Sequence, residues 1–141
     1  VPARLACIRH EYKTAVELFD QSLAQADLGA ISVNLWDVVY YAVALARNGD
    51  ARARTLAVAA EQRVKTESGR VATLAWWCMA ETYALLKDAE SAVRCLRASL
   101  AHEPKLVRRW LADPGSAEVF EGIRRDPVFA ALEGEMLAVP R

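Results

Sequence analysis

The chain has 141 residues, of which 54% are hydrophobic and 26% are charged, a composition that is typical of a folded globular domain and excludes a disordered chain. Its 18 lysines and arginines are balanced by 18 aspartates and glutamates. We therefore expect no nucleic-acid partner, because phosphate binding needs a basic excess or a basic stripe. The longest apolar stretch, residues 31–46, contains Asn34 and Asp37 and is too short to span a bilayer, so no membrane partner is expected either.

The predicted elements are all helices. The alternating apolar and polar runs of half-buried strands are missing, whereas Gly29, Gly49 and Gly69 are evenly spaced and separate segments of helix length. Gly49-Asp50 indicates the end of one helix and the start of the next. In chain order we expect nine helices, at 3–9, 11–26, 31–47, 50–67, 70–87, 88–102, 105–112, 116–124 and 126–137. The short links predict antiparallel neighbours in one domain over residues 1–141, with the 31–47 helix buried on two sides.

A pattern of large and small side chains begins in the fifth expected helix. Its spacing follows W-x2-L-G-x2-Y, then A-x3-F, then P, with replacements of similar size: Trp76, Met79, Ala80, Tyr83, Ala92, Leu96 and Pro104. This pattern resembles the tetratricopeptide repeat (TPR), and Trp110 follows Trp76 by one period of that family. The resemblance implies stacked antiparallel helical hairpins, in which the small residues at 80 and 92 let two helices approach closely.

The same resemblance extends to both sides of this segment. Tyr12, Ala15 and Phe19 are similar to the second helix of an earlier repeat, and Trp36 and Tyr40 begin a middle repeat that fits less well. We expect about three repeats, roughly at 3–27, 31–67 and 70–104, then a partial repeat and C-terminal capping helices at 105–137. The tail is similar to tails that close repeat arrays in large bacterial regulatory proteins, through Phe120, Ile123, Phe129 and Leu132. The chain would begin midway through a helix, which favours a fragment of a longer protein.

The search for chemistry gives no catalytic, cofactor or metal site. His10 and His102 are each followed by glutamate, but Thr14 and Leu106 stand where a zincin motif needs its second histidine. Glycine-rich phosphate loops and serine nucleophile motifs are missing as well. The three cysteines are odd in number and far apart, which favours reduced thiols in a cytoplasmic protein. We predict that the chain is not an enzyme and binds no cofactor.

In arrays of the TPR family the first helix of each hairpin lines the concave face, where partners bind. Carrying this over from Trp76, Trp36 and Trp110 gives a candidate partner-binding face: Asn34, Asp37, Tyr41, Leu74, Trp77, Glu81, Leu85, Arg108 and Leu111. Adjacent residues of a helix point about 100° apart, so Trp77 cannot share the contact of Trp76. It is either a partly exposed groove anchor or a contact with the next repeat. Glu81 either faces the groove, pairs with an arginine or is a carboxylate with a raised pKa.

The functional prediction rests on this face. We expect a scaffold module that binds a protein or peptide partner on its concave side. The alternative is a regulatory or self-association segment of a larger signalling or transcription-regulator protein, where the partner is a second copy of the chain. The lysines and asparagines with which chaperone-binding TPR proteins grip a C-terminal carboxylate have one counterpart here, Asn34, so that clamp is not predicted.

Overall fold

The computed structural model describes residues 2–138, and within them the chain is all-α, with nine α-helices, one 3-10 helix and no strand. The all-α prediction is confirmed. The chain divides into two compact units, Val1–Glu67 (unit 1) and Ser68–Arg141 (unit 2). Each unit has its own buried core, and we describe each by itself; a single domain over the whole chain stays a prediction.

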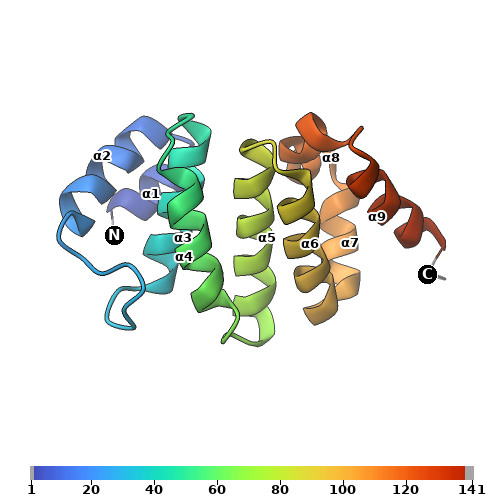
Figure 1. Cartoon of the computed structure of the whole chain (residues 1–141), viewed down its shortest axis with the longest axis horizontal. Helices are drawn as coiled ribbons and strands as arrows, with labels where there is room; N and C mark the ends of the chain where they lie inside the picture. The colour runs from blue at the N-terminus through green and yellow to red at the C-terminus, as the bar shows by residue number, and fades with distance from the viewer. Residues whose placement is uncertain (1, 139–141) are drawn as a thin grey trace. The chain divides into compact units, whose positions relative to one another are not determined.

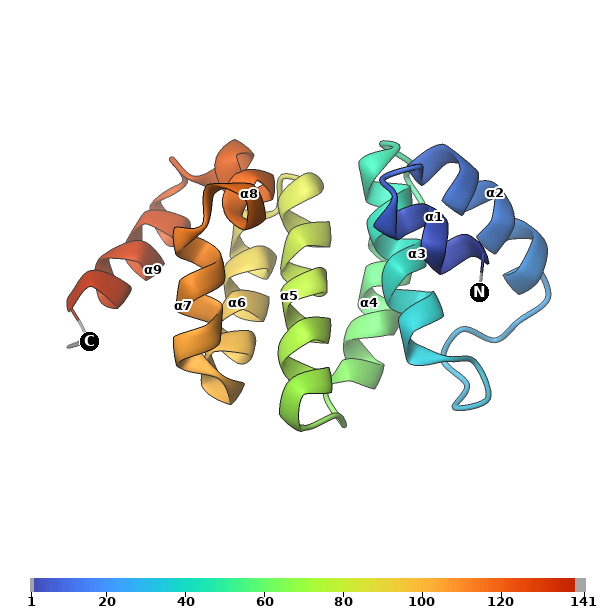
Figure 2. The same cartoon turned by 180° about the vertical axis from the view of Figure 1, so that it is seen from behind.

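Unit 1 consists of two helical hairpins. Helices α1 (Pro2–Ile8) and α2 (Tyr12–Leu23) form the first, and α3 (Leu35–Arg47) and α4 (Ala53–Val64) form the second (Figure 1). Helix α3 packs against both α1 and α2, and Figure 2 shows α1 and α3 side by side. This packing buries the apolar side of α3, whose residues Val38 to Ala46 are all buried except Tyr40.

Unit 2 consists of one hairpin and a helical tail. Helices α5 (Gly69–Leu85) and α6 (Ala89–His102) form the hairpin, followed by α7 (Pro104–Ala112), α8 (Pro114–Ala117), the 3-10 helix η1 (Glu118–Ile123) and α9 (Pro127–Ala138). The tail folds back on the hairpin, with η1 against α5 and with α7 and α9 against α6 (Figure 2). The four tail residues that the sequence predicted to cover an apolar surface are all buried: Phe120, Ile123, Phe129 and Leu132.

The three hairpins turn in the same way. In each, the second residue after the first helix has a left-handed backbone, with φ of 62° at His10, 67° at Gly49 and 61° at Lys87. The next residue is acidic and donates its backbone N–H back to the first helix, over 2.8 Å from Glu11 to Ala6, 2.9 Å from Asp50 to Leu45 and 2.9 Å from Asp88 to Tyr83. This is the Schellman pattern of helix ends. The turns at positions 10, 49 and 87 are almost evenly spaced, at intervals slightly longer than the one from Trp76 to Trp110.

Buried alanines recur at fixed places relative to these turns. Seven residues before each turn stands a buried alanine of the first helix: Ala3, Ala42 and Ala80. Near the start of each second helix stands a fully buried one: Ala15, Ala53 and Ala92. Ala92 is therefore buried on α6, as the sequence predicted.

Two expected helices differ from the observed ones. The helix expected from residue 31 begins at Leu35, because the side chain of Asn34 caps it by accepting the N–H of Trp36 over 2.9 Å. Ile31 lies in the preceding loop and is 95% exposed, so the prediction of a buried helix from residue 31 is wrong there. The single helix expected at 116–124 is two short elements, α8 and η1, which start after Asp113 with Pro114.

Candidate functional site

The unit 2 part of the predicted face is centred on Trp77, which is buried. Only 7% of Trp77 is exposed, and its ring meets Trp110 of α7 edge-on at 5.2 Å and Phe120 of η1 at 5.3 Å between ring centroids. The interpretation of Trp77 as a groove anchor is therefore wrong, and the alternative, a contact with the following helices, is the one observed. Around it Leu74 is 37% exposed, and Glu81, Leu85, Arg108 and Leu111 are partly exposed.

The hairpin turns give the unit 1 part of the predicted face a different register. Counting back from the hairpin turns, the residue that matches Trp76 is Val38 rather than Trp36. The difference of two residues arises because the backbone turn fixes the register, whereas Trp36 stands near the start of α3. Of the residues chosen from Trp36, Asn34 caps the helix and the Oδ1 of Asp37 pairs with the Nε of Arg4 of α1 at 2.9 Å.

Tyr41, the third residue chosen in unit 1, lines an open pocket of about 600 Å³. The pocket lies between α2, the loop after it, α3 and the beginning of α4, and we call it the unit 1 pocket. Its lining is mostly apolar, with a few polar side chains. The apolar residues are Leu23, Ala24, Ala26, Leu28, Leu45 and Leu56, and the polar ones are Asp20, Tyr41, Arg52 and Thr55. Such a composition is typical of sites that bind a ligand or an apolar side chain.

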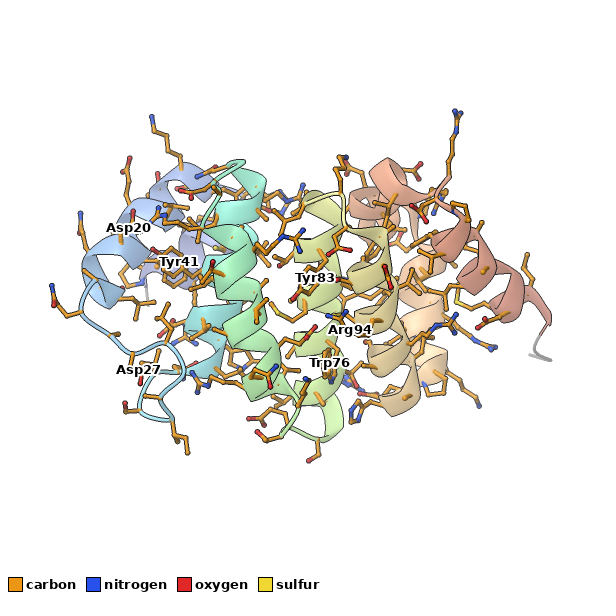
Figure 3. All side chains as sticks on the ribbon, viewed as in Figure 1. Asp20, Asp27, Tyr41, Trp76, Tyr83 and Arg94 are labelled. Atoms are coloured by element: carbon orange, nitrogen blue, oxygen red, sulfur yellow. The ribbon has the colours of Figure 1, made fainter. Side chains whose placement is uncertain are left out.

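The polar side of the pocket is a hydrogen-bonded cluster, which we call the rim cluster: Asp20, Tyr41, Asp50 and Arg52. The Tyr41 hydroxyl donates to Asp20 Oδ1, and Figure 3 shows these two side chains next to each other where α2 meets α3. Arg52 donates to Asp20 through Nη1 over 2.9 Å, and to Asp50 through Nη2 over 2.9 Å and Nε over 3.1 Å. Tyr41 also stacks on Phe19 of α2, with ring centroids 5.1 Å apart. The rim cluster therefore fastens the first hairpin to the second.

The cluster has a defined charge. The hydrogen bond from Arg52 and then that from Tyr41 lower the pKa of Asp20, and the hydrogen bonds from Arg52 lower the pKa of Asp50. Burial, and then the hydrogen bond to Asp20, raise the pKa of Tyr41 to about 12. The bonds to Asp50 and Asp20 raise the pKa of Arg52. At neutral pH the cluster therefore holds two carboxylates, one guanidinium and a neutral phenol, a net charge of −1.

Sequence reasoning found one member of this site and missed the others. Tyr41 was selected, although from a register that the turns correct. Asp20 and Arg52 lie 32 residues apart on different hairpins, and no spacing rule links them before the packing of α2 against α3 is known. One signal was available in the sequence. Gly49-Asp50 marks a hairpin turn, and this places Asp50 and Arg52 at the start of the following helix.

Other chemically reactive groups do not gather in residues 2–138. No three histidine, cysteine, aspartate or glutamate side chains of that range lie together as metal ligands would. Burial raises the pKa of the Cys7 thiol to about 11, and its Sγ contacts the Tyr40 carbonyl oxygen at 3.6 Å. Within residues 2–138, Cys7, Cys78 and Cys95 form no disulfide bond. Within the same range no helix has both the length and the apolar character needed to cross a membrane.

Compared with protein-family models, with curated proteins and with solved structures, the chain gives no match in any of the three. The resemblance to TPR proteins therefore depends on the sequence pattern and on the hairpins. The function must be argued from the unit 1 pocket and its rim cluster.

Proposed function

We propose that the chain is a protein-interaction module built of TPR-like helical hairpins, which binds a peptide or helix of a partner protein. The observation that carries this proposal is the unit 1 pocket, an open and mostly apolar hollow of about 600 Å³ with a polar rim. The pocket takes the place of the concave face as the proposed point of contact.

The repeated hairpins support the TPR-like part of the proposal. Three hairpins share the left-handed turn, the acidic residue after it and a buried alanine on each helix. In unit 1 the first helix of the second hairpin packs on both helices of the first, which is the stacking that helical repeats use to build a continuous core. Repeats of this kind present rigid helices to a partner, so little entropy is lost when the partner binds.

The residue types of the pocket support the binding part. Tyrosine and arginine are enriched among the residues that contribute most to protein interfaces, and they are most effective where a partner's apolar side chain excludes water around them. The side chain of Arg52 is 52% exposed and can be reached by a partner, whereas Tyr41 is only 7% exposed and contacts Arg52 through its hydroxyl. The rim cluster holds Arg52 in place, so it need not be ordered on binding. Leu23 and Leu28, which are partly exposed, supply apolar surface that such a side chain would bury, and the buried Leu45 and Leu56 also line the pocket.

The proposal is tested with a display library of random 12-residue peptides, selected for binding to the whole chain. Enriched peptides should bind the free protein, as measured by fluorescence anisotropy. Thr55→Phe, which fills the pocket from α4, should abolish binding, whereas Val58→Phe on the same helix outside the pocket should not. If no peptide is enriched, the interaction module is the wrong function.

Self-association is the second candidate, and exposed apolar side chains on α5 favour it. Val71 is 39% exposed and Leu74 is 37% exposed, one turn apart on the same helix. A mass measurement in solution distinguishes the two candidates. A stable dimer that Leu74→Glu dissociates would favour the regulatory segment, and a monomer would favour the peptide-binding module.

A further inference from the structure

We infer that the unit 1 pocket selects a partner segment in which a bulky apolar side chain stands next to a lysine or arginine. This inference rests on the proposed function and names the chemistry of the partner. It combines two observations, the apolar lining of the pocket and the negative net charge of its rim cluster.

The hydrogen bonds of the rim cluster determine which charge the partner can carry. Arg52 already donates from Nε, Nη1 and Nη2 to the carboxylates of Asp20 and Asp50, over distances from 2.9 to 3.4 Å. An anionic ligand would have to displace one of these carboxylates and leave it unpaired beside the pocket. The guanidinium is therefore not available to an anion unless the rim cluster breaks.

The carboxylates, in contrast, have capacity left. The side chain of Asp20 is 41% exposed and that of Asp50 is 28% exposed, so both can be reached from solvent. Each carboxylate has about four acceptor positions, and the bonds from Arg52 and Tyr41 do not fill all of them at Asp20. An ammonium or guanidinium group of a partner can therefore bind there and neutralise the residual negative charge.

The lining explains why the cation must have an apolar neighbour. Leu23, Leu28, Leu45 and Leu56 offer no hydrogen-bonding side-chain group to a charged ligand. An aliphatic or aromatic side chain gains free energy there by leaving water. Once it fills the pocket, it also removes water from the rim, and the attraction between the cation and the carboxylates becomes stronger.

The same peptide library tests this inference through the sequences that it enriches. The expected result is a leucine, isoleucine, methionine or phenylalanine with lysine or arginine within two positions. Replacing that basic residue by alanine in a synthetic peptide should weaken binding about two- to fivefold, the size of an exposed ion pair. Binding of the basic peptide should also weaken as the salt concentration rises, and binding of the alanine peptide should not.

Two variants of the protein locate the charge effect. Asp20→Asn removes one charge from the pocket lining and should lower the affinity for the basic peptide about two- to fivefold, with no change for the alanine peptide. Asp50→Asn leaves the lining untouched and keeps an oxygen that can accept the Arg52 N–H, a bond of 2.9 Å in the structure. Asp50→Asn should also lower the affinity for the basic peptide, but by less than Asp20→Asn does. Circular dichroism and thermal unfolding confirm that both variants are folded.

Several outcomes would overturn the inference. Enriched peptides with aspartate, glutamate or a free C-terminal carboxylate beside the apolar residue would show that Arg52 accepts an anion. Peptides whose binding survives Thr55→Phe would bind elsewhere, and the proposed function would stand without this pocket. A dimer of the chain that Thr55→Phe dissociates would identify a second copy as the occupant. If no peptide is enriched, the proposed function fails together with the inference.

Discussion

Units 1 and 2 each begin with a helical hairpin of the same kind, and in both an ion pair from the same position of the second helix joins this hairpin to a later element. Ten residues after the turn, the second helix carries Asp20 in unit 1 and Arg97 in unit 2. Asp20 pairs with Arg52 of the next hairpin, and Arg97 Nη2 donates to Glu135 of α9 over 2.9 Å. The sign of the charge is reversed and the partner differs, but each pair joins a hairpin to a later element of its unit. Ala59 stands at the matching position of the α3–α4 hairpin and can form no such pair, so the position is used in the first hairpin of each unit.

The two units also differ in a matched residue of the first helix of a hairpin, when the α3–α4 hairpin of unit 1 is compared with the α5–α6 hairpin of unit 2. Eight residues before the turn stands Tyr41 in unit 1 and Met79 in unit 2, where Met79 is fully buried. In unit 2 an aromatic cluster packs between the hairpin and the tail, and its members are Trp77, Trp110, Phe120 and Phe129. In unit 1 the hydroxyl of Tyr41 organises polar groups and an open pocket lies beside them. The aromatic cluster completes the core of unit 2, whereas the rim cluster of unit 1 lies beside an open pocket.

The largest effect is expected for the aromatic cluster. Trp77→Ala should lower the free energy of unfolding by about 3–5 kcal/mol, because it leaves a cavity beside Trp110 and Phe120. Urea unfolding followed by circular dichroism measures this loss. Trp36→Ala in unit 1, where the ring is only partly buried, is the control and should cost less. Equal losses in the two variants would contradict the assignment of Trp77 to a core.

An intermediate effect tests whether the hairpins of the two units are equivalent. Ala92→Leu should destabilise by about 1–3 kcal/mol, because a larger side chain does not fit at a fully buried position of α6. Ala15→Leu, five residues after the turn of its own hairpin, should have an effect of the same size. Ala101→Leu on the exposed side of α6 is the control and should be nearly neutral. Thermal unfolding of the three variants measures these effects. If Ala92→Leu lowers the stability and Ala15→Leu does not, the two hairpins are not equivalent.

The smallest effect is expected for the rim cluster. Tyr41→Phe should lower the free energy of unfolding by about 0.5–1.5 kcal/mol, because it removes the hydrogen bond donated to Asp20 and the longer one, 3.3 Å, accepted from Arg52, while Asp20 stays paired with Arg52. The ring and its stacking on Phe19 are kept, so the packing is little changed. Chemical denaturation at neutral pH measures the difference. If Tyr41→Phe lowers the free energy of unfolding as much as Trp77→Ala does, the rim cluster stabilises unit 1 as strongly as the aromatic cluster stabilises unit 2.

The hydrogen bond between Tyr41 and Asp20 makes the stability depend on pH, and the direction follows from the pKa of Tyr41. The pKa of Tyr41 is raised to about 12 in the folded protein, against about 10 for a free tyrosine, so the folded state holds the phenol proton more tightly. Its contribution to stability is complete below about pH 10 and is lost as the pH rises from about 10 to about 12. The stability difference between the parent and Tyr41→Phe should therefore shrink over that range. A difference that stays constant would show that the phenol is not held by burial and by Asp20.

The pKa of Asp20 is lowered, so its contribution has the opposite dependence. It is present above the ordinary aspartate pKa of about 3.9 and is lost as the pH falls through the lower folded value.

The sequence was most informative where a single hairpin determines the outcome. The pattern from Trp76 to Leu96 predicted two helices with buried residues at known places, and Ala80, Tyr83, Ala92 and Leu96 are all buried. Gly49-Asp50 predicted a turn, and Gly49 has the expected left-handed backbone. His10 and Lys87 make the same turn without glycine, so composition alone could not reveal the repeat of the turns.

The candidate site was harder to predict, because its side chains meet only after the hairpins pack. Asp20 and Arg52 come from different hairpins, and Tyr41 was selected from a tryptophan register that differs by two residues from the register of the turns. The burial of Trp77 depends on the tail, since Trp110 and Phe120 cover it. Contacts within one hairpin follow from local periodicity, whereas these depend on the packing of segments separated in the sequence.

The ion pairs that join each hairpin to a later element also bear on how quickly each unit can fold. The Asp20–Arg52 and Arg97–Glu135 pairs join residues 32 and 38 positions apart. The helices of each hairpin meet across turns of only a few residues. The contacts within a hairpin close short loops, and the ion pairs close loops of fewer than 40 residues. Closing such loops costs little chain entropy, so the contact order of each unit is low. We therefore expect each unit to fold rapidly.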